Sequence, residues 1–190
     1  MKSLPARGRT ADFSRGVTLV EVLVAILIVS FGLLAMAAMQ ANAIKFSKTS
    51  EMRAVATLLA RDLGDRIRAN SVNGVPSGNY NATQPYTALT GAPTVPGCAN
   101  AASCTGAEIA ARDMAEWRRA LYASLPAADG YVVVNGTTAP VTVDIWLAWS
   151  DPQDPDAPRA DAASASECPG AFVPSNTTNP PRCAYFRIGL

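Results

Sequence analysis

The sequence predicts an α+β fold, in which a long N-terminal helix precedes a small antiparallel β-sheet head with one additional helix. Three patterns predict it. Residues 17–39 form an apolar run with a single ionisable residue, Glu21. Apolar residues then recur at helical spacing through residues 55–67, and strict alternation follows in residues 141–149. A helix buries residues spaced three and four apart, whereas a strand buries every second residue. The patterns therefore indicate an apolar helix, an amphipathic helix and a half-buried strand.

The apolar run of residues 17–39 is long enough to cross a membrane. At about 1.5 Å per residue, a helix of this length covers about 35 Å, slightly more than the hydrocarbon core of a bilayer. A carboxylate inside such a span costs about 2.5–3.5 kcal/mol on insertion scales. The presence of Glu21 therefore indicates a partner or a function for this side chain.

A basic leader precedes the run. Residues 1–16 contain four cationic residues and one acidic residue, a net charge of +3, and end with Gly16. Since the whole chain carries +1, residues 17–190 carry −2 (+1 − 3). Positive charge before a span keeps that end cytoplasmic, so the head is expected in the periplasm or outside the cell. A mature chain that is not basic is not expected to bind nucleic acid.

The segment Gly16-Val17-Thr18-Leu19-Val20-Glu21 and the apolar run that follows resemble the class III signal of type IV pilins and pseudopilins. Family members commonly have phenylalanine where this chain has Val17. The resemblance implies that a prepilin peptidase cuts between Gly16 and Val17 and methylates the new amine of Val17. It also implies that Glu21 neutralises the amine of a neighbouring subunit when the helices bundle into a fibre.

Two other interpretations of the N-terminus stay open. The leader and apolar run could be an ordinary secretory signal cleaved after Ala41-Asn42-Ala43, although the run exceeds the usual length of about 7–15 apolar residues. A plain single-pass anchor explains the length of the run but leaves Glu21 without a role.

The helix is expected to continue past the membrane to residue 70, because no proline occurs between residues 17 and 75. The sequence thus divides into a leader (1–16), an N-terminal helix (17–70, transmembrane over 17–39) and a globular head (71–190). The second half of the helix carries an apolar stripe that should pack on the head. The stripe consists of Val55, Leu59, Leu63 and Ile67, broadened by Leu58.

A second helix is predicted to start at Thr105, because Thr105 and Glu108 have the spacing of a capping box. Pro126 is predicted to end it. Its apolar face would consist of Ala110, Met114, Trp117, Leu121 and Leu125. Arg118 and Arg119 are expected in solvent. Residues 113–126 look like the head helix of PilV-type minor pilins.

Residues 131–149 predict a β-hairpin, because two β-like runs flank Asn135-Gly136, a dipeptide that readily adopts the positive φ angles of a turn. One face of the second run should lie on the long helix, namely Val141, Val143, Ile145, Leu147 and Trp149. Further strands are expected near residues 86–89 and over residues 184–188.

All four cysteines lie beyond residue 97, in the portion expected to be exported: Cys98, Cys104, Cys168 and Cys183. An even number in an oxidising compartment predicts disulfides, with three possible connectivities. We favour Cys98–Cys104 and Cys168–Cys183, since each pair closes a loop rich in small residues. A zinc site is disfavoured, because the chain has no histidine and no CxxC spacing.

The sequence contains no recognisable catalytic motif. Without histidine, Ser-His-Asp and Cys-His sites are excluded, and nucleotide-binding glycine motifs are absent. Three acidic residues in 151–156 have oxygen ligands suited to calcium, but the surrounding prolines and the lack of glycine favour a solvated loop. We expect no enzymatic activity, no cofactor and no metal.

The family resemblance implies a structural function. The chain would be a minor pilin of a type IV pilus, which helps prime assembly, enters the fibre and supports adhesion and twitching motility. Expected partners are the prepilin peptidase, other minor and major pilins, the inner-membrane assembly platform and a tip adhesin. Before assembly it would be anchored in the inner membrane of a Gram-negative bacterium with its head in the periplasm, and afterwards it would be extracellular. The alternatives are a minor pseudopilin of a type II secretion system and a periplasmic binding module, anchored or secreted.

Overall fold

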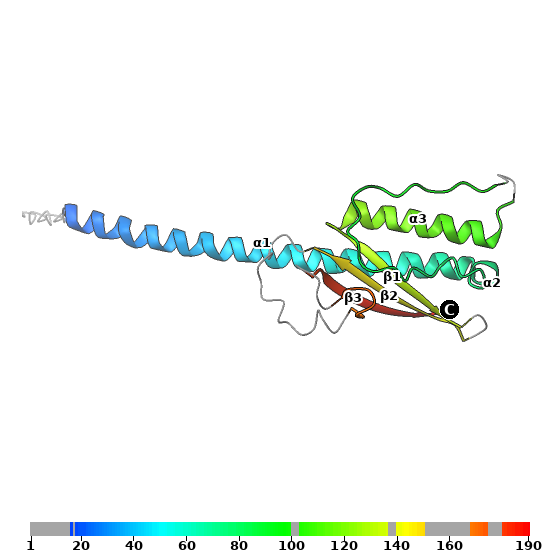
Figure 1. The fold of residues 1–190 in the computed structure, drawn as a ribbon. Helices are drawn as coiled ribbons and strands as arrows, with labels where there is room; N and C mark the ends of the chain where they lie inside the picture. The colour runs from blue at the N-terminus through cyan, green and yellow to red at the C-terminus, as the bar shows by residue number, and fades with distance from the viewer. Residues whose placement is uncertain (1–15, 17, 100–102, 137–139, 151–167, 175–179) are drawn as a thin grey trace, which may run out of the picture. The chain divides into compact units, whose positions relative to one another are not determined.

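The computed structural model describes residues 16, 18–99, 103–136, 140–150, 168–174 and 180–190. These residues confirm the α+β class (Figure 1). The helices are α1 (Leu19–Ala69), α2 (Ser71–Gly74) and α3 (Gly106–Ser124), and the strands are β1 (Asp129–Asn135), β2 (Thr142–Trp149) and β3 (Arg182–Gly189). The chain divides into two compact units, residues 1–44 and 45–190, and the boundary falls within α1.

The sheet of the head is antiparallel, with the strand order β1-β2-β3. β1 and β2 form the predicted hairpin, in which Val132 lies opposite Ile145. Gly136 follows β1 with a φ of 90°, a left-handed conformation that glycine adopts because it has no Cβ. β3 pairs with the other side of β2, where Phe186 lies opposite Ile145. The hairpin and the last strand are therefore confirmed.

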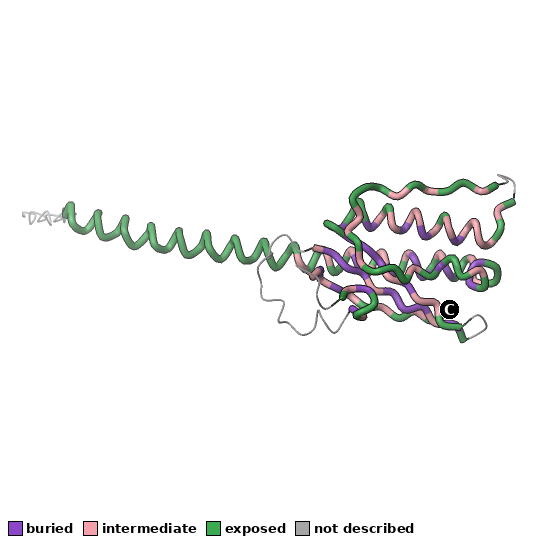
Figure 2. Tube along the Cα trace, viewed as in Figure 1, coloured by how far each residue is buried: buried purple, intermediate pink, exposed green. Residues whose placement is uncertain are grey.

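The main core of the head lies between the sheet and the two long helices, where Figure 2 shows most of the buried residues. The residues expected on the inward face of the second β run are all buried, and so is the apolar face expected for the second helix. Trp117 is fully buried, and its indole N–H donates to the carbonyl oxygen of Leu59 at 2.9 Å. A Cβ on Gly130 would collide with the Trp117 ring, so only glycine lets β1 pass this close to α3. The ring thus joins α3 to both α1 and β1.

The capping box at the start of α3 is also confirmed. The Thr105 hydroxyl oxygen accepts a hydrogen bond from the Glu108 N–H at 3.2 Å, and the Glu108 carboxylate accepts one from the Thr105 N–H at 2.8 Å. Each bond satisfies a backbone donor that the first turn of a helix leaves unpaired.

The buried face of α1 agrees with the predicted stripe in part, since Leu63 and Ile67 are buried and Val55 and Leu59 pack partly buried against the core. Its buried residues are Ala56, Ala60, Leu63, Gly64 and Ile67. The expectation for Leu58 is wrong, because this side chain is 64% exposed. A Cβ on Gly64 would collide with the side chain of Ile188, so β3 packs directly on the α1 backbone there. The close approach of the sheet requires small residues on this face of α1. The predicted stripe was based on large apolar side chains and therefore missed them.

The expected strand near residues 86–89 is wrong. This segment makes isolated backbone hydrogen bonds, from the Tyr86 N–H to the Phe172 carbonyl at 2.7 Å and from the Leu89 N–H to the Ala128 carbonyl at 3.2 Å. The segment meets the sheet earlier, at an isolated bridge between Ala82 and Val132. A β-ladder requires successive hydrogen bonds to one neighbouring strand. Residues 86–89 bond to two different segments instead, so they form no strand.

Candidate functional site

The beginning of α1 carries the residues predicted to govern assembly. Gly16 is exposed, and a Cβ placed on it would have no neighbour within 4 Å. Val17, the predicted cleavage and methylation position, lies outside the described residues. The Thr18 hydroxyl oxygen accepts a hydrogen bond from the Glu21 N–H at 3.3 Å, and the Thr18 carbonyl accepts one from the Val22 N–H at 3.2 Å. Thr18 is therefore the N-cap of α1, and Glu21 is its third helical residue.

The Glu21 carboxylate is exposed, and it makes no hydrogen bond or ion pair with any other residue that the structure describes. The cap on the Glu21 backbone N–H comes from Thr18, so the carboxylate is free to meet a cation. Its place in the first helical turn is favourable for a negative charge, because the helix dipole presents partial positive charge there.

The apolar part of α1 is exposed along its whole length. Every residue from Thr18 to Lys48 is exposed, including Leu19 at 84% and Phe31 at 66%. By length and composition, α1 can cross a membrane. Ser30 fits such surroundings, because its hydroxyl donates to the carbonyl of Ile26 at 2.7 Å. A helix that is apolar on all sides is stable when lipid or other helices surround it.

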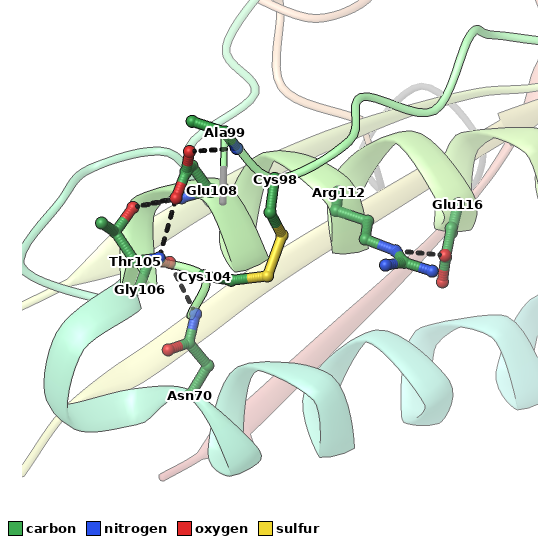
Figure 3. Close-up of a disulfide and its surroundings, with 9 residues drawn as sticks. All are labelled: Asn70, Cys98, Ala99, Cys104, Thr105, Gly106, Glu108, Arg112 and Glu116. Carbon is green, nitrogen blue, oxygen red and sulfur yellow. Dashed lines mark hydrogen bonds and ion pairs between the residues drawn. A yellow bond between two sulfur atoms is a disulfide. The ribbon is translucent and has the colours of Figure 1, made fainter. Parts of the chain in front are cut away.

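A disulfide between Cys98 and Cys104 lies beside the start of α3, with a Cα–Cα distance of 5.3 Å (Figure 3). Glu108 connects the two features, since its carboxylate also accepts a hydrogen bond from the Ala99 N–H at 2.8 Å. Backbone hydrogen bonds from Thr105 and Ala99 lower the pKa of Glu108. The carboxylate therefore caps the helix and attaches the disulfide loop to it.

A second disulfide joins Cys168 to Cys183 on β3, with a Cα–Cα distance of 5.8 Å. These are the two local pairs that the sequence favours. The segment after Cys168 covers part of the sheet face turned away from the helices. There Phe172 is fully buried, with its ring 5.2 Å from that of Tyr131 and 6.0 Å from that of Tyr86. The second disulfide thus holds a small additional core in place.

An ion-pair network attaches α3 to α1. Arg66 donates to Glu116 at 2.7 Å and to Asp62 at 3.0 Å, and it lies 3.5 Å from Asp113. The Tyr80 hydroxyl donates to Asp113 at 2.6 Å. The hydrogen bond from Arg66 is the main reason that the pKa of Glu116 is lowered, and burial together with Asp113 raises the pKa of Tyr80. All members have partners, so the network is structural.

Arg118 is not solvated as expected. It donates to the buried carboxylate of Asp129 at 2.9 Å, and the same carboxylate accepts hydrogen bonds from the backbone N–H groups of Gly130 and Thr87. Asp129 begins β1, so its role depends on how the chain returns to α3. No sequence pattern links Arg118 to Asp129, so the ion pair could not be predicted from the sequence.

Nothing in the described part of the chain resembles a metal centre, since no group of three or more histidine, cysteine, aspartate or glutamate side chains is placed to hold an ion. The acidic residues 151–156, considered above for calcium, lie outside the described residues. A groove of about 660 Å³ lies between residues 79–93 and α3, and its lining mixes uncharged polar residues (asparagine, threonine and glutamine) with small or apolar ones and Arg118.

Two family models match the chain. One, described as the prokaryotic N-terminal methylation motif, matches residues 13–37. The other, described as type IV pilin Tt1218, matches residues 38–115. Together they extend without a gap from the leader to the first half of α3 and end before the sheet. No curated protein and no solved structure matches the chain.

Proposed function

We propose a minor-pilin function for this chain, which is a type IV pilin-like protein with a class III signal. In this proposal the chain is held in the inner membrane by α1 and is then inserted into a type IV pilus. There it helps to prime assembly and supports surface attachment and twitching motility. Its partners are the prepilin peptidase, the assembly platform, and the other minor and major pilins.

The observation that carries the proposal is the free carboxylate of Glu21 on an apolar helix. Cleavage between Gly16 and Val17 would place an amine one residue before the Thr18 cap and about one helical turn from Glu21. Within one chain, the new amine and the Glu21 carboxylate would belong to residues four positions apart. In a bundle of staggered helices, the amine of one subunit reaches the Glu21 of the next.

The proposal of a minor rather than a major subunit rests on the head. Residues 113–126 resemble the head helix of PilV-type minor pilins, and they include Trp117, which contacts both α1 and β1. A secretion-system pseudopilin would use the same α1 chemistry. Deletion of the gene distinguishes the two machines, since loss of surface pili with normal protein secretion supports a pilus, and the reverse supports a pseudopilus.

The first test concerns processing. Co-expression with a prepilin peptidase should yield a mature chain that begins with N-methylated Val17, as measured by mass spectrometry. Gly16→Leu should leave the precursor uncut, because the larger side chain obstructs the peptidase. Gly32→Leu is the matched control: a Cβ at Gly32 also has no neighbour within 4 Å, yet this residue lies far from the cut. A mature chain beginning after Ala43 would overturn the proposal.

The second test concerns incorporation. Glu21→Ala should reduce recovery in sheared fibres by about tenfold or more, because an ion pair at about 4 Å is worth about 4 kcal/mol at an effective dielectric constant of 20. Its level in membranes should stay the same or rise, since a charged group is removed from the segment expected to lie in the membrane. Glu21→Asp should be intermediate. The control is Glu51→Ala, which removes an exposed glutamate from the same helix. Normal recovery of Glu21→Ala would contradict the proposed role of Glu21.

A further inference from the structure

The outer edge of β3 carries unpaired backbone groups. The Leu190 N–H donates to the Val141 carbonyl at 3.0 Å, and hydrogen-bonded pairs alternate along an antiparallel ladder. From the register of β2 and β3, Phe186 and Ile188 therefore direct their backbone groups toward β2. Tyr185 and Arg187 direct theirs outward, where no other described segment offers them a backbone partner.

The opposite edge of the sheet is closed. Ala82 exchanges two backbone hydrogen bonds of 2.9 Å with Val132 on β1, and the Asn81 side chain accepts one from the Val134 N–H at 2.9 Å. An open strand edge is a template for pairing with another chain, and proteins usually block it. This head blocks one edge with its own loop and leaves the other edge open over the described residues.

A groove with arginines in its wall lies beside the open edge. Its volume is about 380 Å³, and it is lined by Arg61, Asp65 and Arg68 from α1 and by Arg187, Ile188 and Gly189 from β3. Arg68 donates to the outward-facing carbonyl of Gly189 at 3.0 Å, which places this guanidinium at the edge itself.

The charges of the groove are unevenly matched. Arg68 pairs with Asp65 at 2.8 Å, and Arg187 pairs with Asp144 at 2.7 Å. Arg61 is exposed and makes no ion pair with any residue that the structure describes. Of the three arginines that line the groove, two have a carboxylate partner among the described residues, and Arg61 is the one whose charge is left unmatched. A ligand suited to this groove supplies backbone donors and acceptors to β3 and a carboxylate to Arg61.

We propose that an extended, carboxylate-bearing peptide segment of a partner protein adds to the sheet as a strand along β3. Main-chain hydrogen bonds to Tyr185 and Arg187 supply affinity, and acidic side chains at every second position of the added strand, on the face that Ile188 turns toward α1, meet Arg61 and Arg68. A nucleic acid is a poorer match, because its backbone offers no N–H groups to the outward carbonyls of β3. If the chain is a fibre subunit, the partner is a neighbouring subunit of the fibre. Only this identification of the partner rests on the proposed function.

The test uses the full chain in detergent micelles and a fluorescein-labelled peptide of nine residues that alternates glutamate with valine. Saturable binding by fluorescence anisotropy is expected, and it should weaken as salt is added. Arg61→Gln should weaken binding about two- to fivefold, the range for an exposed ion pair. Arg119→Gln, which removes an exposed arginine from α3, is the matched control and should leave binding unchanged.

Amide hydrogen exchange provides the readout that is specific for strand addition. The peptide should slow exchange at the N–H groups of Tyr185 and Arg187 and leave that of Phe186, which already faces β2, unchanged. No binding of the peptide, equal binding of a peptide with glutamine in place of glutamate, or unchanged exchange at Tyr185 and Arg187 would each overturn the proposal. Displacement of the peptide by a single-stranded oligonucleotide would assign the groove to nucleic acid instead. These outcomes do not depend on cleavage at Gly16, so the proposed function can fail or stand separately.

Discussion

The two parts of α1 are continuous in sequence and opposite in their surroundings. From Thr18 to Lys48 every residue is exposed, whereas the part within the head buries five residues between Ala56 and Ile67. The first part has large apolar side chains that are exposed, and the second uses alanine and glycine to bring a sheet close. The difference shows that one continuous helix can have two roles. Its first part has an apolar surface suited to lipid or to other helices, and its second part stabilises the head.

The sharpest test of this comparison uses the same substitution in both parts. Leu63→Ala should destabilise the head by about 2–5 kcal/mol, because Leu63 is fully buried and its loss leaves a cavity. Leu27→Ala should leave the head unchanged, because Leu27 is 56% exposed. The measurement is urea unfolding of the full chain in micelles, followed by tryptophan fluorescence, since all three tryptophans lie in the head. Equal losses would show that the two parts of α1 unfold together.

The disulfides sharpen the comparison within the head. Replacing Cys168 and Cys183 by serine should cost about 3 kcal/mol, the value for a closed loop of about 15 residues, and it should also release the cover over Phe172. Replacing Cys98 and Cys104 should cost about 2 kcal/mol, because that loop is shorter. Unfolding of the oxidised variants measures both costs. Peptide mapping of the non-reduced parent protein is the control, and a Cys98–Cys183 crosslink would contradict both pairings.

A smaller effect on the stability of the head is expected from pH, through the carboxylate of Asp144 on β2. Asp144 is buried and accepts hydrogen bonds from Arg187, Tyr185 and Asn135. The bonds from Arg187 are the main reason that its pKa is lowered. Since the folded pKa lies below the unfolded value of about 3.9, the stabilisation is present above pH 4 and is lost as the pH falls through the folded pKa.

Asp144→Asn should therefore destabilise the head by about 1–2 kcal/mol at pH 7, and the difference from the parent should shrink toward pH 3. The control is Asp65→Asn, which removes an exposed carboxylate paired with Arg68 and should have little effect on unfolding. Unfolding measured at several pH values decides the matter: a constant difference between Asp144→Asn and the parent would contradict the assigned cause.

Sequence patterns predicted the elements whose information is local. The capping spacing of Thr105 and Glu108 marked the start of α3, and the alternation of residues 141–149 marked the inward face of β2, because both depend on near neighbours in the chain. The contact of Gly64 with Ile188 and the pairing of Arg118 with Asp129 depend on distant segments meeting. Leu58 was misassigned for the same reason, since nothing local tells which of two adjacent helix faces the sheet will cover.

The candidate assembly residues were marked just as locally. Gly16 and Glu21 stood out because a small residue and a carboxylate flank the start of an apolar run, and no tertiary contact was needed to notice them. The open edge of β3 left no such mark. It follows from the strand order and from which residues of β3 pair with β2, and neither can be inferred from spacing.

The hydrogen bond from Ser30 to Ile26 has a consequence for how two such helices would slide past each other. Between residues 19 and 39 the only polar side chains are those of Glu21 and Ser30, and that of Ser30 is satisfied by its own helix. A second helix that slid along the axis of this one would gain similar dispersion attraction at every position. It would gain electrostatic attraction only where a cation meets Glu21. If two copies pack through this surface, a single carboxylate would therefore decide their axial position, and the apolar surface would let the helices shift until that contact forms.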